Sequence, residues 1–183
     1  PEEVGIFAVE KSLLPFKKSF KVAKNATYEI IMKCFKGGTN LKKYIIDDSQ
    51  YLLVNELFDK AKDTGYGKFT DIAVHFRDLI HYINHDLPDD VIVYFLHHSE
   101  LDGDGREKVK TIGKMLDEKL CVEGCFDVVL YCQDNKFFTQ ANGQSVAKTP
   151  EGMFELEIPN DLKTVDVAIR DYYGLNNNTQ EDK

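Results

Sequence analysis

The chain has 183 residues, of which 43% are hydrophobic and 30% are charged, and its formal net charge is −8. This length suits one domain of ordinary size, and no apolar run approaches the roughly 20 residues that cross a bilayer. The four cysteines form no C-x-x-C pair, which predicts reduced thiols rather than a disulfide scaffold. We therefore expect a cytoplasmic globular protein that does not associate with a membrane.

The charge is distributed unevenly along the chain. Residues 1–43 contain nine lysines and four acidic residues, a net charge of +5, whereas the remainder contains 14 basic and 27 acidic residues. A basic segment of this kind can face phosphate groups, or it can be an ordinary solvated surface in which lysines gather by chance. The sequence leaves both interpretations open.

Strand-like and helix-like segments alternate along the chain. The apolar runs that predict strands lie at 4–9, 42–46, 91–96 and 126–132. Helical spacing of apolar residues falls between and after them, at 26–35, 49–62, 69–83, 111–120 and 161–173. This alternation predicts an α/β fold with a mainly parallel sheet and helices on both faces.

Shorter features complete the predicted organisation. The segments KFFTQA and MFELEIP predict a small antiparallel extension near the C-terminus, and LDGDGREK predicts a flexible polar loop. No linker or repeat divides the chain, so we expect one domain over 1–175 and a disordered tail over 176–183.

Polar residues follow three of the predicted strands directly. In open parallel sheets, ligands bind beyond the carboxyl ends of the strands. Two adjacent carboxylates are tolerable there if a cation is bound or if one of them holds a water molecule, although a helix N-cap beside a surface acid is the structural alternative. The residues in question are Glu10, Asp47, Asp48, His97, His98 and Ser99.

The order of these segments resembles a known family. KKYIIDDSQYLLVNEL, GYGKFTDIAVHFRDLIHYI, VIVYFLHHSE, KVKTIGKMLDEKL, FDVVLYCQ and AKTPEGMFEL, which together span about residues 4–174, are similar to the phage-encoded ATP-binding proteins of the RecA/RadA-like AAA group. The resemblance implies a RecA-like P-loop ATPase core that binds ATP and Mg²⁺. It also implies a role in DNA recombination or replication, a single-stranded DNA partner and a homo-oligomer.

The resemblance assigns roles to individual residues. An apolar strand followed by two acids matches the Walker B element, so Asp47 would support Mg²⁺, and Asp48 would assist the ion and act as the candidate base. Glu10 is a second candidate base, with an exposed surface acid as the alternative. The remaining assignments are a phosphate sensor at His97, His98 and Ser99, a mobile DNA-facing loop at LDGDGREKVK, and Lys148 as a cation that reaches a neighbouring nucleotide or is simply solvated.

The sequence departs from the family in one respect. The glycine-rich phosphate cradle G-x-x-x-x-G-K-[ST] occurs nowhere in the 183 residues. Either the chain begins downstream of this motif, which its start at Pro1 without a methionine favours, or the protein lacks it. Two other classes of protein therefore stay open: a non-catalytic RecA-like module that binds single-stranded DNA or a replication partner, and a stand-alone hydrolase whose metal is held by Asp47, Asp48, His97 and His98.

Overall fold

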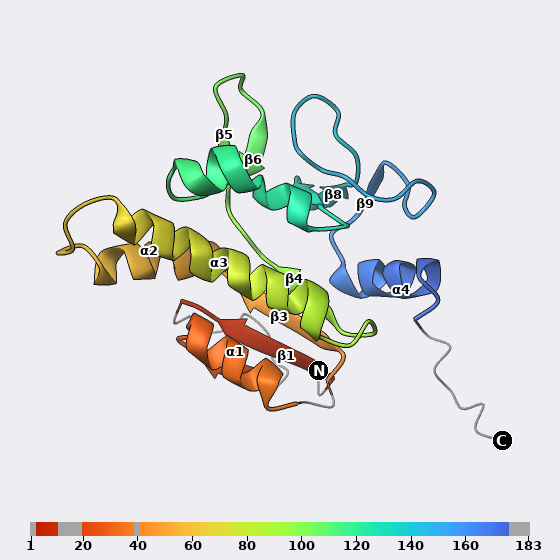
Figure 1. The fold of residues 1–183 in the computed structure, drawn as a ribbon. Coiled ribbons are helices and arrows are strands. Elements are labelled where there is room, and N and C mark those ends of the chain that lie inside the picture. The colour runs from red at the N-terminus through yellow and green to blue at the C-terminus, as the bar shows by residue number, and fades with distance from the viewer. Residues whose placement is uncertain (1–2, 11–19, 39–40, 176–183) are drawn as a thin grey trace. The chain divides into compact units, whose positions relative to one another are not determined.

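The computed structural model describes residues 3–10, 20–38 and 41–175, and the predicted tail at 176–183 lies outside them. The chain forms two compact units, coloured in sequence order in Figure 1. The first unit contains Pro1–His98 and Lys110–Cys121, and the second contains Ser99–Val109 and Val122–Lys183.

A four-stranded, all-parallel sheet forms the centre of the first unit. Its strands are β1 (Val4–Ala8), β2 (Lys21–Lys24), β3 (Lys43–Asp47) and β4 (Ile92–Phe95), in the order β2-β1-β3-β4. The predicted α/β class with a parallel sheet is thereby confirmed. The strand β2 was not predicted, because its sequence KVAK has a lysine at each end and lacks an apolar run.

Three α-helices accompany this sheet: α1 (Tyr28–Lys36), α2 (Gln50–Asp59) and α3 (Gly67–Asp86). The hydroxyl of Thr27 caps α1 by accepting a hydrogen bond from the backbone N–H of Ile30 at 3.4 Å. The predicted three-four spacing in α3 buries one face of that helix, made of Ile72, Ala73, Phe76, Leu79 and Ile80. The predicted helix at 111–120 is shorter than expected and forms the π-helix η1 (Met115–Leu120).

The main hydrophobic core lies on one face of the sheet. Phe7 and Ile46 are register partners on adjacent strands, so their side chains share a face, and residues of all three α-helices join the same cluster. The ring of Phe35 in α1 lies edge-on to Phe7, with 5.5 Å between centroids. Helices on both faces stay a prediction, because this cluster, to which α1, α2 and α3 all contribute, describes one face only.

The second unit is smaller and mainly antiparallel. It contains a three-stranded sheet of β7 (Tyr131–Gln133), β8 (Lys136–Phe138) and β9 (Glu157–Pro159), followed by α4 (Leu162–Tyr172). The antiparallel extension near the C-terminus is confirmed. The predicted strand at 126–132 was wrong in part, because only its end is a strand, and that strand belongs to the antiparallel sheet.

The segment predicted as a flexible loop forms a hairpin. Strands β5 (Ser99–Leu101) and β6 (Glu107–Val109) pair antiparallel, and a short 3-10 helix, η2 (Val122–Cys125), lies against β6. The carboxylate of Asp102 accepts the backbone N–H groups of Asp104 and Arg106, at 2.9 and 2.8 Å, which closes the turn between the two strands.

No helix in the described part of the chain combines the length and the apolar character that a membrane span requires.

Candidate functional site

The three strand ends that carry the predicted site residues are neighbours. Strands β1, β3 and β4 are adjacent in the sheet, and the register pairs Ala8 with Asp47 and Ile46 with Phe95. One further hydrogen bond runs from the Val9 N–H to the Asp47 carbonyl at 3.2 Å, just beyond β1. We call the polar residues at these ends the carboxyl-edge cluster: Glu10, Asp47, Asp48, His97 and His98.

The acid pair lies at a sharp turn between β3 and α2. Asp48 has φ of 58°, a left-handed conformation that aspartate adopts more readily than most residues. Partial burial raises the pKa of the Asp47 carboxyl, and the neighbouring Asp48 carboxylate raises it further, while the backbone N–H of Asp48 acts in the opposite direction. A bound cation would relieve this electrostatic cost.

His98 connects the acid pair to β4. Its Nε2 atom lies 3.4 Å from Oδ1 of Asp48, and its ring lies edge-on to Tyr51 at 5.9 Å between centroids. The His98 side chain is 53% exposed and that of Asp48 is 35% exposed. Because the contact is long for a hydrogen bond and both groups meet solvent, both are able to contact a ligand.

His97 is held more firmly than its neighbour. Its Nε2–H donates to the carbonyl oxygen of Lys110 at 2.7 Å, because a carbonyl can only accept. The Nδ1 atom of the neutral ring is then an acceptor that lies 2.9 Å from Oγ of Ser49, and it competes for the single hydroxyl hydrogen of Ser49 with the Leu96 carbonyl at 3.0 Å. A ligand that reached His97 would have to displace one of these two bonds.

Ser49 occupies the N-cap position of α2, but its side chain does not cap the helix. Its side chain makes no capping hydrogen bond, and instead its Oγ lies within hydrogen-bonding distance of both the Leu96 carbonyl, at 3.0 Å, and His97. Its backbone N–H also donates to Leu96, at 2.9 Å. The start of α2 is thereby bonded to the end of β4.

Glu10 has a partner that sequence reasoning missed. The side-chain amide of Asn55 donates to Oε1 of Glu10 at 3.1 Å. Asn55 lies in the second turn of α2, 45 positions from Glu10 along the chain, and the sequence holds no local signal that pairs the two. The carboxylate of Glu10 is oriented by this contact.

The two other predicted site residues belong to the second unit. Ser99 is exposed and begins β5, where it pairs with Val109. The backbone of Lys148 exchanges hydrogen bonds with that of Val129, at 2.8 and 2.9 Å, and the lysine is half-buried. Their predicted roles, as part of the sensor and as the cation for a neighbouring nucleotide, stay predictions.

Within residues 3–10, 20–38 and 41–175, no three histidine, cysteine, aspartate or glutamate side chains come together as a group that could hold a metal ion. A stand-alone metal site built from Asp47, Asp48, His97 and His98 therefore has no support in these residues. Mg²⁺ needs fewer protein ligands when a nucleotide supplies phosphate oxygens.

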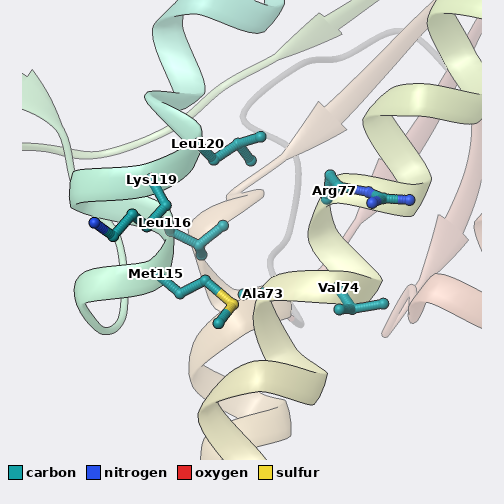
Figure 2. A pocket seen from close by; sticks show the side chains of 7 residues that line it. All are labelled: Ala73, Val74, Arg77, Met115, Leu116, Lys119 and Leu120. Carbon is teal, nitrogen blue, oxygen red and sulfur yellow. The ribbon is translucent and has the colours of Figure 1, made fainter.

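A hollow lies elsewhere in the first unit, between α3 and η1 (Figure 2). Leu116 and Leu120 point from η1 toward α3, whereas the charged ends of Arg77 and Lys119 point away. The complete lining is Ala73, Val74, Arg77, Met115, Leu116, Lys119 and Leu120. A catalytic pocket needs convergent polar groups, and this hollow contains no residue of the carboxyl-edge cluster.

Comparison with known proteins gives no relative: no family model, no curated protein and no solved structure matches the chain.

Proposed function

We propose that the carboxyl-edge cluster is the magnesium- and water-positioning part of an ATP site in a RecA-like P-loop ATPase that acts in DNA recombination or replication. The observation that carries the proposal is the position of Asp47 and Asp48. They lie between Glu10 and His98, at the carboxyl ends of three adjacent strands of the parallel sheet. The role on DNA and the assembly into a homo-oligomer derive from the family resemblance alone.

The residues present suit Mg²⁺ together with a nucleotide. Asp47 would hold the ion, with Asp48 beside it, because hard divalent cations prefer carboxylate oxygens and the paired acids repel each other without one. When bound, the ion would neutralise charge on the terminal phosphates. Glu10, oriented by Asn55, and Asp48 are the two carboxylates available to orient a water molecule.

This chain alone should not bind ATP tightly. Backbone amides and the lysine of a phosphate cradle supply most contacts to a triphosphate, and the motif is missing from the 183 residues. Two carboxylates without a cation repel the ligand. The test therefore uses the protein with whatever sequence its gene encodes upstream of Pro1.

The decisive measurement is ATP hydrolysis by that full-length protein and its Asp47→Asn variant. We expect the substitution to lower kcat by about 100-fold or more, the scale seen when one electrostatic contact to the reacting group is removed. Asp63→Asn, in the exposed α2–α3 connection, is the matched control and should leave the rate unchanged. Equal rates for wild type and Asp47→Asn would remove the magnesium assignment.

The two candidate bases can be separated in the same assay. Asp48→Asn and Glu10→Gln each remove one carboxylate while keeping its size. Only the variant of the true base should lose kcat by a factor comparable to that of Asp47→Asn. The other variant should change the rate by less than about tenfold, since general-base catalysis contributes roughly 10²–10⁴.

A non-catalytic RecA-like module that binds single-stranded DNA or a replication partner is the second candidate. The lysine-rich first third of the chain favours it, since a basic surface suits a polyanion whether or not ATP is hydrolysed. The upstream sequence separates the two candidates. A phosphate-cradle motif encoded within about 40 residues before Pro1 supports the ATPase, and its absence supports the module.

A further inference from the structure

Two histidines lie side by side on the solvent-facing side of α3. His81 and His85 are four residues apart, so they are one turn apart on the same side of the helix. Both residues are exposed, and their rings approach to 4.2 Å between centroids, with 47° between the ring planes. Because α3 ends at Asp86 and β4 begins at Ile92, this pair lies near the amino edge of the parallel sheet, where the strands start.

The other histidines of the chain have polar partners. The sequence contains five histidines, and His75 and His98 lie 2.7 and 3.4 Å from a carboxylate oxygen, while His97 is bonded to a backbone carbonyl. Within the described part of the chain, His81 and His85 make no hydrogen bond or ion pair, and the ring that each one contacts is that of the other. Their ring nitrogens are therefore available to a ligand.

The separation of the two rings suits a metal ion bound to both. A metal–nitrogen bond to histidine is about 2.0–2.1 Å long, and the ring centre lies about 1 Å further from the ion. Two histidines bound at 90° therefore have ring centres about 4.5 Å apart, and a tetrahedral angle would place them about 5 Å apart. The observed 4.2 Å is closer to the right-angle arrangement, which is typical of Cu²⁺ and Ni²⁺.

Chelation requires little rearrangement. Each ring has to direct one nitrogen toward the ion, and an exposed side chain can rotate to do so. Since neither ring is hydrogen-bonded in the described residues, no existing bond is lost when it turns. The helix fixes the spacing of the two residues before the ion arrives, so the entropy lost on binding is small.

The charges near the pair are mixed. Asp86, next to His85, is exposed and has no basic partner among the described residues, and the carbonyl end of α3 carries partial negative charge. Lys36 of the adjoining helix α1 has the opposite effect, since its ammonium lies over the ring of Tyr82 at 5.7 Å. The imidazole nitrogens, rather than the surrounding field, therefore determine what binds.

An ordinary structural role explains only part of this arrangement. A positively charged histidine in the last turns of a helix is stabilised by the helix dipole. That role concerns each residue separately, and two charged rings one turn apart would repel each other. It does not explain two rings in contact with each other and without other polar partners.

We propose that His81 and His85 chelate a transition-metal ion that prefers imidazole nitrogen and right-angle coordination, Ni²⁺ or Cu²⁺, with water at the remaining positions. The described residues supply these two ligands and no third one, so the ion would be exposed and exchangeable. The site goes beyond the proposed function and does not depend on it, because Mg²⁺ prefers oxygen ligands and would bind at the opposite edge of the sheet.

The test is the affinity of the full-length protein, prepared without a histidine tag, for Ni²⁺, measured by isothermal titration calorimetry. Ni²⁺ is the probe because, unlike Cu²⁺, it does not oxidise thiols, and the chain has four cysteines. His81→Gln and His85→Gln should each raise the Kd at least about tenfold, because the second ligand of a chelate acts at high effective concentration. Saturating Ni²⁺ should also raise the melting temperature of the wild type, and EDTA should reverse this shift.

A third histidine of the same helix provides the control. His75 is 52% exposed, and His75→Gln should keep the wild-type affinity for Ni²⁺. Equal affinities of wild type and His81→Gln overturn the inference, as does an equal loss in His75→Gln. Displacement of Ni²⁺ by about 5 mM Mg²⁺ also overturns it, since Mg²⁺ does not compete for imidazole nitrogen.

Failure of this inference can be distinguished from failure of the proposed function. Asp47→Asn should bind Ni²⁺ as tightly as wild type does, whatever its rate of ATP hydrolysis. Loss of hydrolysis in Asp47→Asn together with unchanged Ni²⁺ binding by His81→Gln contradicts only the histidine site.

Discussion

At the carboxyl edge of the parallel sheet, polar side chains are bound to one another, whereas at the amino edge Lys21 and Lys36 are exposed to solvent. Ser49, His97 and the Lys110 carbonyl form a hydrogen-bonded chain, and Ser49 is completely buried. Lys21 and Lys33, by contrast, are exposed and have no acidic partner in the described part of the chain.

The difference indicates two kinds of electrostatic environment. Fixed, partly buried groups suit a site in which the positions of single atoms matter, because they lose little freedom when a ligand arrives. Exposed ammonium groups interact with other charges over a longer range and through solvent, so their interactions weaken with salt. The predictions below test whether the two edges differ in this way.

The largest effect on stability is expected for Ser49→Ala. The substitution removes a buried hydroxyl and leaves Nδ1 of His97 without this partner, which should lower the free energy of unfolding by about 1–3 kcal/mol. Urea denaturation measures this loss in the free energy of unfolding. Ser99→Ala, at an exposed position of β5, should change stability by less than about 0.5 kcal/mol. Equal stability of the two variants would mean that the carboxyl edge is not held by this chain of bonds.

For Asp47→Asn we expect a smaller change in stability than for Ser49→Ala, and an increase instead of a loss. Burial and Asp48 raise the folded-state pKa of this carboxyl, so the folded state holds the proton more tightly than the unfolded state does. The stability that this proton contributes is fully present below the ordinary aspartate pKa. It is lost as the pH rises through the raised pKa of the folded state. The variant should therefore melt at a higher temperature than wild type at pH 7, and the two should converge near pH 3.

Thermal unfolding between these pH values checks this prediction. Asp63→Asn should follow the wild type over the whole range, because the α2–α3 connection that carries it is exposed. A variant at position 47 that melts lower than wild type at pH 7 would show that the carboxylate stabilises the fold rather than straining it. Stabilisation by removing a charge is a common property of functional sites.

The sequence predicted the framework of the site better than its contacts. Apolar runs identified β1, β3 and β4, and the rule that ligands bind beyond parallel strands selected the acids and histidines that follow them. The bonds of Ser49 to His97 and of Asn55 to Glu10 join residues 48 and 45 positions apart. Local periodicity carries no information about such pairs, since they form only when β1, α2 and β4 pack together.

The missed and misplaced strands have a related cause. An edge strand has one neighbour and needs few apolar residues, so β2 carries two lysines and gives no apolar signal. The run FDVVLY is apolar enough for a central strand, yet only its last residue belongs to a strand, which pairs antiparallel in the second unit. Strand propensity depends on the packing around a strand, and packing is a property of the fold rather than of the segment.

The smallest effect is expected at Lys42, a lysine of the amino edge that is bound to a carboxylate. Lys42 contacts both oxygens of Asp90, at 2.9 and 2.8 Å, but its side chain is 47% exposed. Lys42→Gln should therefore lower the free energy of unfolding by less than about 1 kcal/mol at low salt, and the difference should disappear in about 1 M NaCl. The loss in Ser49→Ala should persist at that salt concentration, because hydrogen bonds between buried neutral groups are not screened. A salt-resistant loss in Lys42→Gln would show that the amino edge, too, is held by fixed contacts, and the distinction between the two edges would then fail.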